Sequence, residues 1–132
     1  MNRPLPAAVL ALAFCVPALA GTPTELLAGL VADAAREGTV VAPSSPRGET
    51  FFKTRRAEWS CASCHTADPR QEGRHAVTGK SIQPMAPSVE PARLTDRAKT
   101  DKWFRRNCRD VVGRPCTLAE QADVVAYLVS LK

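Results

Sequence analysis

The apolar positions of the first half of the chain recur at helical spacing. Leu26, Leu27, Leu30, Val31 and Ala34 follow the three-and-four-residue interval that places side chains on one face of an α-helix. The stretch Thr22-Pro23-Thr24-Glu25 offers a capping box with proline at the first helical position, and Gly38 is a typical helix stop. The pattern therefore predicts a helix between Thr22 and Gly38.

A second clear helix is predicted at the carboxyl end. Thr117-Leu118-Ala119-Glu120 is another capping box, and the positive charge of Lys132 complements the negative, carboxyl-terminal end of the helix dipole. The apolar positions of this helix are Leu118, Val124, Val125, Tyr127, Leu128 and Leu131. We expect both helices to contribute their leucines and valines to the core.

Two less regular helices are expected between these. A short helix carries Phe51 and Phe52 toward Trp59, after a loop over residues 39–50, and another runs from Thr95 to about Arg109. Residues 66–94 hold four prolines and no period, which predicts a long loop of the kind that wraps a ligand. No segment alternates with period two over the length of a strand, so the fold class is predicted to be all-α.

The composition limits the size of the core. At 132 residues, 45% hydrophobic and 23% charged, the chain is one globular domain, and its 11 prolines against 5% aromatic residues indicate many loops. A chain this short buries only about two-thirds of its unfolded surface. A bound group that adds apolar area would therefore stabilise it.

The first 20 residues are predicted to be a signal peptide rather than part of the fold. Arg3 precedes an apolar run from Ala7 to Val16, and Ala18-Leu19-Ala20 has the small-residue pattern of a cleavage site. The run is shorter than a membrane span needs. We expect cleavage after Ala20, one mature domain over 21–132, export to the periplasm and no stable membrane insertion afterwards.

Export changes the meaning of charge and cysteine content. The full chain carries a net charge of +5, and loss of Arg3 lowers it to +4, which is too small and too scattered for a nucleic-acid interface. Four cysteines remain after cleavage, in a compartment that permits disulfides. They are Cys61, Cys64, Cys108 and Cys116.

Cys61-Ala62-Ser63-Cys64-His65 is the pattern of c-type haem attachment. Two thiols three residues apart lie on one side of a helical turn and can each add to a haem vinyl group, while the histidine that follows binds the iron as proximal ligand. One covalent haem c is therefore the predicted cofactor, with the aromatic residues as candidates to pack around it. These are Phe51, Phe52, Trp59, Trp103 and Phe104.

Two other uses of the motif are less favoured. A thioredoxin-like redox pair needs a βαβ pattern, which the chain lacks. A zinc site would need Cys108 and Cys116 as further ligands, and their separation is not the usual short pairing.

The sixth iron ligand decides the chemistry, and residue types leave it open. His75 and Met85 are the side chains that could reach the iron from the long loop. The order of helices resembles class I cytochromes c, in which a ligand methionine usually comes shortly before the last helix, but no methionine occurs there in this chain.

The late region instead resembles the SHP (sphaeroides haem protein) type of class I cytochrome c. The likeness rests on four segments along the mature chain: Gly48–Phe52, Trp59–His65, Met85–Val89 and Lys102–Cys108 with Cys116 following. The resemblance implies that Asn107 binds the oxidised iron, leaves it on reduction and opens a site for a diatomic ligand. It also implies a disulfide between Cys108 and Cys116 beside that ligand.

The expected function is that of a periplasmic monohaem cytochrome c that transfers single electrons and binds O2 or NO at the reduced iron, either as a carrier or as part of a redox enzyme. The resemblance implies other cytochromes as partners, and Arg105, Arg106 or Arg109 could pair with a haem propionate or an acidic partner. The alternatives are an ordinary carrier ligated by Met85 and a module that binds or senses a diatomic gas.

Overall fold

The computed structural model describes residues 21–56 and 58–132, so the predicted signal peptide lies outside the described residues. The described part contains helices and one small antiparallel sheet, whose strands pair Gly73 with Ile82 and Arg74 with Ser81. In chain order the elements are α1 (Pro23–Arg36), α2 (Ser45–Lys53), α3 (Cys61–His65), β1 (Gly73–Arg74), β2 (Ser81–Ile82), α4 (Arg97–Val112) and α5 (Leu118–Ser130).

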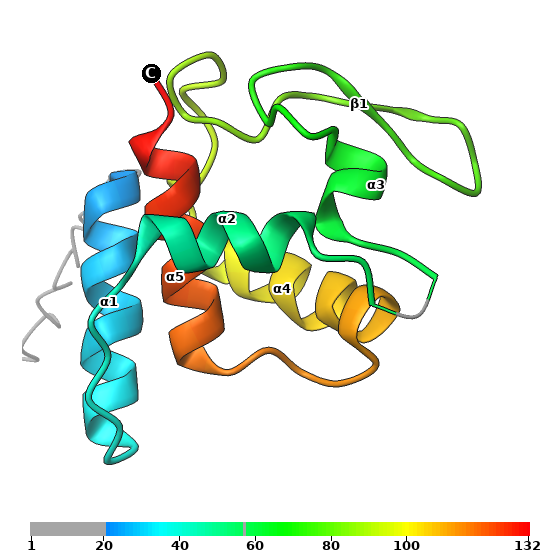
Figure 1. Ribbon diagram of the computed structural model, residues 1–132. Helices are drawn as coiled ribbons and strands as arrows, with labels where there is room; N and C mark the ends of the chain where they lie inside the picture. The colour runs from blue at the N-terminus through cyan, green and yellow to red at the C-terminus, as the bar shows by residue number, and fades with distance from the viewer. Residues whose placement is uncertain (1–20, 57) are drawn as a thin grey trace, which may run out of the picture.

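The core lies where α1 and α2 pack against α5. Figure 1 shows α1 alongside α5 and α2 crossing α5 near the middle of the molecule. The crossing is close because α2 has a glycine there: a Cβ on Gly48 would lie 1.9 Å from the carbonyl oxygen of Asp123. Leu30, Phe52 and Val125 are among the most deeply buried side chains of this unit.

A buried carboxylate joins α2 to α5. The Nε and Nη2 atoms of Arg47 donate to Asp123 at 2.8 Å each, and the backbone N–H of Ser44 donates to the same carboxylate at 2.7 Å. Asp123 is 8% exposed, and these three donors replace the water that its burial removes. The start of α2 is thereby fixed against the middle of α5.

The two predicted capping boxes are confirmed. The Thr22 side chain accepts from the N–H of Glu25 at 3.1 Å, and that of Thr117 accepts from the N–H of Glu120 at 3.2 Å, with each glutamate returning a hydrogen bond to the cap residue. Gly38 follows α1 at a φ of +79°, the left-handed conformation that favours glycine. Local sequence chemistry therefore determines these helix ends.

The structure differs from the predicted elements in three places. Helix α2 begins at Ser45, capped by Ser44, so the loop predicted over 39–50 stops at residue 44; Pro46 fits because the first helical turn needs no donor there. Helix α4 is capped by Asp96 rather than Thr95 and continues to Val112, where Gly113 ends it. The third difference is the hairpin of β1 and β2, which interrupts the predicted long loop.

Helix α4 contacts the other helices at only a few points in the described residues, although it is 16 residues long. Its first turn is tied to α1, because Arg97 donates to Asp33 at 2.6 Å and also to Asp101 at 2.8 Å. No helix in residues 21–56 or 58–132 has the length and apolarity required to cross a bilayer.

Candidate haem site

The motif Cys61–His65 forms the short helix α3. Ser60 caps it, accepting from the N–H of Ser63 at 3.2 Å, while the hydroxyl of Ser63 accepts from the N–H of Ser60 at 2.9 Å. Ser63, one of the two residues between the motif cysteines, therefore helps to start the helix. One helical turn then places the two thiols on the same side, as the spacing predicted.

Both motif cysteines are free thiols in this structure. Burial raises the pKa of Cys61 to about 11, so this thiol is protonated at neutral pH. The sulfur of Cys64 accepts a hydrogen bond from the backbone N–H of Ala76 at 3.3 Å. Neither cysteine is paired with the other, and both remain available for covalent attachment of a ligand.

The half-buried imidazole of His65 lies at the end of α3. Burial lowers the pKa of His65 to about 4, with the positive charge of Arg93 as a second cause, so the ring is neutral at physiological pH and has a lone pair to give a metal. Its ring centroid is 6.3 Å from that of Phe52, whose own ring meets Tyr127 edge-on at 5.7 Å. Residues of α2 and α5 therefore support the ring.

Gly73 is a residue of this site that the sequence reasoning missed. A Cβ at this position would lie 2.2 Å from the carbonyl oxygen of Cys64 and 3.1 Å from the Cα of His65. The first strand of the hairpin therefore lies directly on the haem-attachment motif, and only glycine fits there. The one signal in the sequence was an isolated glycine in a stretch already assigned to a loop.

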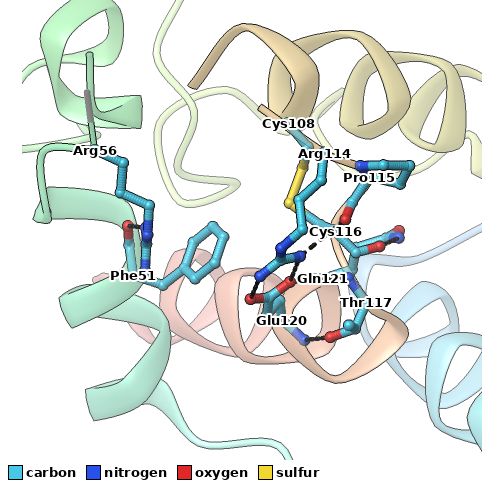
Figure 2. The surroundings of a disulfide bond; sticks show 9 residues. All are labelled: Phe51, Arg56, Cys108, Arg114, Pro115, Cys116, Thr117, Glu120 and Gln121. Atoms are coloured by element: carbon cyan, nitrogen blue, oxygen red, sulfur yellow. Dashed lines mark hydrogen bonds and ion pairs between the residues drawn. A yellow bond between two sulfur atoms is a disulfide. The ribbon is translucent and has the colours of Figure 1, made fainter. Parts of the chain in front are cut away.

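Asn107 lies on the penultimate turn of α4 and is half-buried. Its amide makes no side-chain hydrogen bond to any residue that the structure describes, and no side-chain polar atom of the described residues is both buried and without a partner, so this amide is open to solvent. The next residue, Cys108, is joined to Cys116 with the Cα atoms 5.6 Å apart. Figure 2 shows this disulfide connecting α4 to the segment that leads into α5.

The segment inside the disulfide loop has its own ion pair. Arg114 donates to both carboxylate oxygens of Glu120, at 2.9 and 2.7 Å (Figure 2). This guanidinium is the main cause that holds the pKa of Glu120 below its ordinary value. The chain that follows Asn107 is thereby held by one covalent bond and one bidentate ion pair.

The other two ligand candidates differ in how they are held. The Nδ1 atom of His75 accepts hydrogen bonds from the N–H groups of Val77 and Thr78, both at 3.2 Å. A neutral His75 therefore carries its proton on Nε2 and has no free lone pair there. Met85 is half-buried and packs against the core, with its backbone N–H bound to the carbonyl of Pro69 at 2.8 Å.

The aromatic candidates fall into two groups. Phe51 and Phe52 are buried in the core, and Trp59 and Phe104 are partly buried. Trp103 is 46% exposed, with the guanidinium of Arg106 6.0 Å above its ring. Arg105 and Arg109 line an open groove between α1, α4 and the start of α5, together with Asp33 and Glu37.

The structure gives no support to a zinc site. Cys108 and Cys116 are bonded to each other, and the described residues contain no cluster of three or more His, Cys, Asp or Glu side chains able to hold a metal ion. The donor set at α3 is instead two thiols and one neutral imidazole within a single helical turn, which fits a covalently attached haem.

Comparison with known proteins leads to the same conclusion. The family model described as a domain of unknown function (DUF1924) matches residues 39–128. The cytochrome c-type protein SHP of Cereibacter sphaeroides is 41% identical over 86% of this chain and 89% of its own length. The chain belongs to the SHP family of c-type cytochromes. Cytochrome c'' of Methylophilus methylotrophus is 40% identical over 67% of the chain and 65% of its own length.

Solved structures agree with the sequence relationship. Oxidised SHP, described as an oxygen-binding cytochrome c, has 38% identity and a TM-score of 0.73, covering 84% of this chain and 98% of that protein. Oxidised cytochrome c'' has 34% identity and a TM-score of 0.71, covering 83% of this chain and 94% of that protein. The class I cytochrome c fold is confirmed, with the small hairpin as an addition to the predicted all-α architecture. Like its relatives, this SHP-family protein is a monohaem cytochrome that carries one covalent haem c.

Proposed function

We propose that Cys61 and Cys64 hold the haem through two thioethers and that His65 is the proximal iron ligand, in a periplasmic protein that transfers single electrons and binds a diatomic ligand when reduced. The observation that carries this proposal is the geometry of α3, where two free thiols and a neutral, half-buried imidazole occupy one capped turn. When bound, haem c supplies a one-electron couple and an axial coordination position.

We further propose that Asn107 is the displaceable sixth ligand. Its half-buried amide makes no side-chain hydrogen bond in the described part of the chain, so binding a metal breaks no existing contact within the protein. An uncharged amide oxygen is a hard donor that suits Fe(III) better than Fe(II). One relative's structure is described as that of an oxygen-binding cytochrome, and a cytochrome c'' structure is described in terms of haem-ligand detachment, which agrees with a ligand that leaves.

The disulfide gives this ligand a fixed base. Cys108 is buried at 5% exposure and bonded to Cys116, so the backbone next to Asn107 cannot move far from the start of α5. A side chain that swings between two positions on such a base changes its own rotamer rather than the helix. The disulfide is in this view a positioning element and takes no part in electron transfer.

Attachment is tested by extraction with acidified acetone and by mass spectrometry of the peptide that contains Cys61 and Cys64. We expect the colour to stay with the protein and the peptide to carry the mass of one haem. Release of all the colour into the solvent would overturn the proposed covalent attachment.

The sixth ligand is tested by spectroscopy of paired variants. Asn107→Ala is expected to change the ferric spectrum, and Met85→Leu to leave it unchanged; His75→Ala is a further control. After reduction, the wild-type protein should become high-spin and bind CO readily. The alternative is an ordinary carrier in which Met85, half-buried against the core, binds the iron in both redox states. A spectrum perturbed by Met85→Leu and insensitive to Asn107→Ala would establish that alternative.

Residues 1–20 are proposed to be a cleaved signal peptide, and other cytochromes to be the electron-transfer partners. The amino-terminal sequence of protein recovered from the periplasm tests the first point, and should begin at Gly21. An uncleaved terminus would show that the apolar run is retained.

A further inference from the structure

The hairpin segment, residues 73–82, projects from the body of the molecule beside α3 (Figure 1). It carries Val77, which is 78% exposed and is one of the few large apolar side chains that the described surface presents to solvent. A single exposed valine needs no explanation by itself. Its position relative to the redox site and to the surrounding charges makes it informative.

The turn of the hairpin is rigid, because its polar groups are satisfied within it. His75 donates its backbone N–H to the carbonyl of Lys80 at 2.8 Å and accepts from the N–H of Gly79 at 2.8 Å, while its Nδ1 binds the N–H groups of Val77 and Thr78. Gly79 has a φ of +68°, as the turn requires. Val77 is therefore held outward by a preformed turn rather than left on a loose loop.

The same turn touches the redox site. The backbone N–H of Ala76, the neighbour of Val77, donates to the sulfur of Cys64 at 3.3 Å. The proposed function attaches haem to that sulfur. A protein that covers Val77 would then lie one residue and one hydrogen bond from a thioether of the haem, a short route for an electron.

Two exposed cations flank Val77. Arg74 and Lys80 are exposed on either side of the turn, and neither has a carboxylate partner among the described residues. Of the nearest acidic groups in sequence, Asp68 is paired with Arg70 at 2.8 Å, whereas Glu72 keeps its charge and accepts a hydrogen bond from the hydroxyl of Ser81 at 2.6 Å. Arg74 donates to the carbonyl of Gly79 at 3.0 Å, which leaves its charge unpaired, so the turn presents an apolar centre between two cations.

We propose that this surface, made of Arg74, Val77 and Lys80, is the docking site for an electron-transfer protein with an acidic contact face. Charge complementarity selects the partner's face and accelerates encounter, and burial of Val77 fixes the docked orientation. The inference rests on the proposed attachment of haem at Cys64.

The test uses the holoprotein and reduced flavodoxin, an acidic one-electron carrier, as the probe in stopped-flow experiments at low ionic strength. Arg74→Glu/Lys80→Glu should lower the second-order rate constant of reduction by about tenfold or more, because it reverses the local charge. Val77→Asp should lower it as well, by about threefold or more, on the same electrostatic ground. Added salt should slow the wild-type reaction and bring the variants toward the same rate.

The matched control is Lys99→Glu/Lys102→Glu, which makes the same charge change on exposed positions of α4. It should slow the reaction by about twofold at most, because those charges lie outside the docking surface. Reduction by photochemically generated lumiflavin semiquinone, which is small and neutral, should proceed at the wild-type rate in every variant.

Equal slowing by the two double variants would overturn the proposal, because steering would then follow net charge rather than this surface. A hairpin double variant that flavodoxin reduces at the wild-type rate, or a wild-type rate insensitive to salt, would also overturn it. These outcomes differ from failure of the proposed function, which appears as absence of haem mass on the Cys64 peptide. Variants are compared only after each is found to carry a full complement of haem.

Discussion

The two sides of this molecule are stabilised in different ways. On one side α1, α2 and α5 pack against one another through buried apolar side chains, and the backbones of α2 and α5 approach closely at Gly48. On the other side α3 has no fully buried residue, and α4 buries only Thr100 and Cys108. Caps, ion pairs, a backbone contact at Gly73 and a disulfide hold that second side.

The difference shows where a small chain places its limited apolar content. The packed side forms a conventional helical core, whereas the side that carries the haem-attachment motif is positioned by directional and covalent contacts. In a family whose members carry covalent haem c, the cofactor adds apolar area next to these elements. The polar contacts then set the geometry of the site rather than most of the stability.

The largest effect on stability is expected from adding a side chain at the point where α2 and α5 are in contact. Gly48→Ala would place a methyl group 1.9 Å from the carbonyl of Asp123, and backbone cannot move aside as a side chain can. We expect the free energy of unfolding to fall by about 3 kcal/mol, measured by urea unfolding of the holoprotein.

The control for this change is Gly29→Ala, another glycine within a helix. There the added Cβ meets only the Nη1 atom of Arg97, at 3.0 Å, and not the Nε and Nη2 atoms that bind Asp101 and Asp33. Because alanine favours the helix, this variant should be neutral or slightly more stable, by about 0.5 kcal/mol. If both variants lose stability equally, the close approach of the backbones at Gly48 is not the cause of the loss in Gly48→Ala.

The next effect concerns the disulfide on the haem-binding side. Cys108→Ser/Cys116→Ser opens a loop closed across a separation of eight residues, and should lower the free energy of unfolding by about 2–3 kcal/mol. We also expect a change in the ferric spectrum, because the backbone beside Asn107 loses its fixed base. Reduced stability with an unchanged spectrum would mean that the disulfide supports the fold but not the ligand.

Gly73→Ala sharpens the comparison, since it makes the same kind of clash on the other side. The methyl group would lie 2.2 Å from the carbonyl of Cys64. Because the hairpin can move away from α3 without opening the core, we expect a smaller loss of about 1–2 kcal/mol. Hydrogen exchange should accelerate in residues 73–82 while α5 stays protected. Global unfolding comparable to that of Gly48→Ala would show that the two sides form one cooperative unit.

The smallest effect is pH-dependent. The Arg114 guanidinium lowers the pKa of Glu120 from its ordinary value of 4.5, so the ion pair adds stability above that pH and loses it as the pH falls through the lower folded pKa. We expect the stability difference between wild type and Glu120→Gln to be present at pH 7 and to disappear in acid. Urea unfolding as a function of pH measures it.

Glu25→Gln is the matched control, because Glu25 occupies the same position in the capping box of α1 and its pKa is lowered by Thr22 rather than by an arginine. Its loss of stability at neutral pH should be smaller than that of Glu120→Gln. Equal losses of stability in the two variants would mean that the capping box causes the loss and that the Arg114 ion pair does not contribute.

Part of this structure follows from short-range sequence signals. Thr22 with Glu25 and Thr117 with Glu120 predicted the starts of α1 and α5 because a capping box needs only four adjacent residues. The start of α2 was missed, because Ser44-Ser45-Pro46 satisfies a loop as well as a helix start. The hairpin was missed because strands of two residues are too short to show alternation.

The sequence by itself determined the starts of α1 and α5, the Cys61–His65 motif and, through the resemblance to SHP, the family and its cofactor. Only the tertiary structure decided that Gly73 lies on the motif, that Ala76 binds the sulfur of Cys64 and that Asp123 fixes the start of α2. The physical reason is the sequence separation of the groups that interact. Caps and covalent motifs depend on neighbours along the chain, whereas these contacts depend on where distant backbone segments meet once the core has packed.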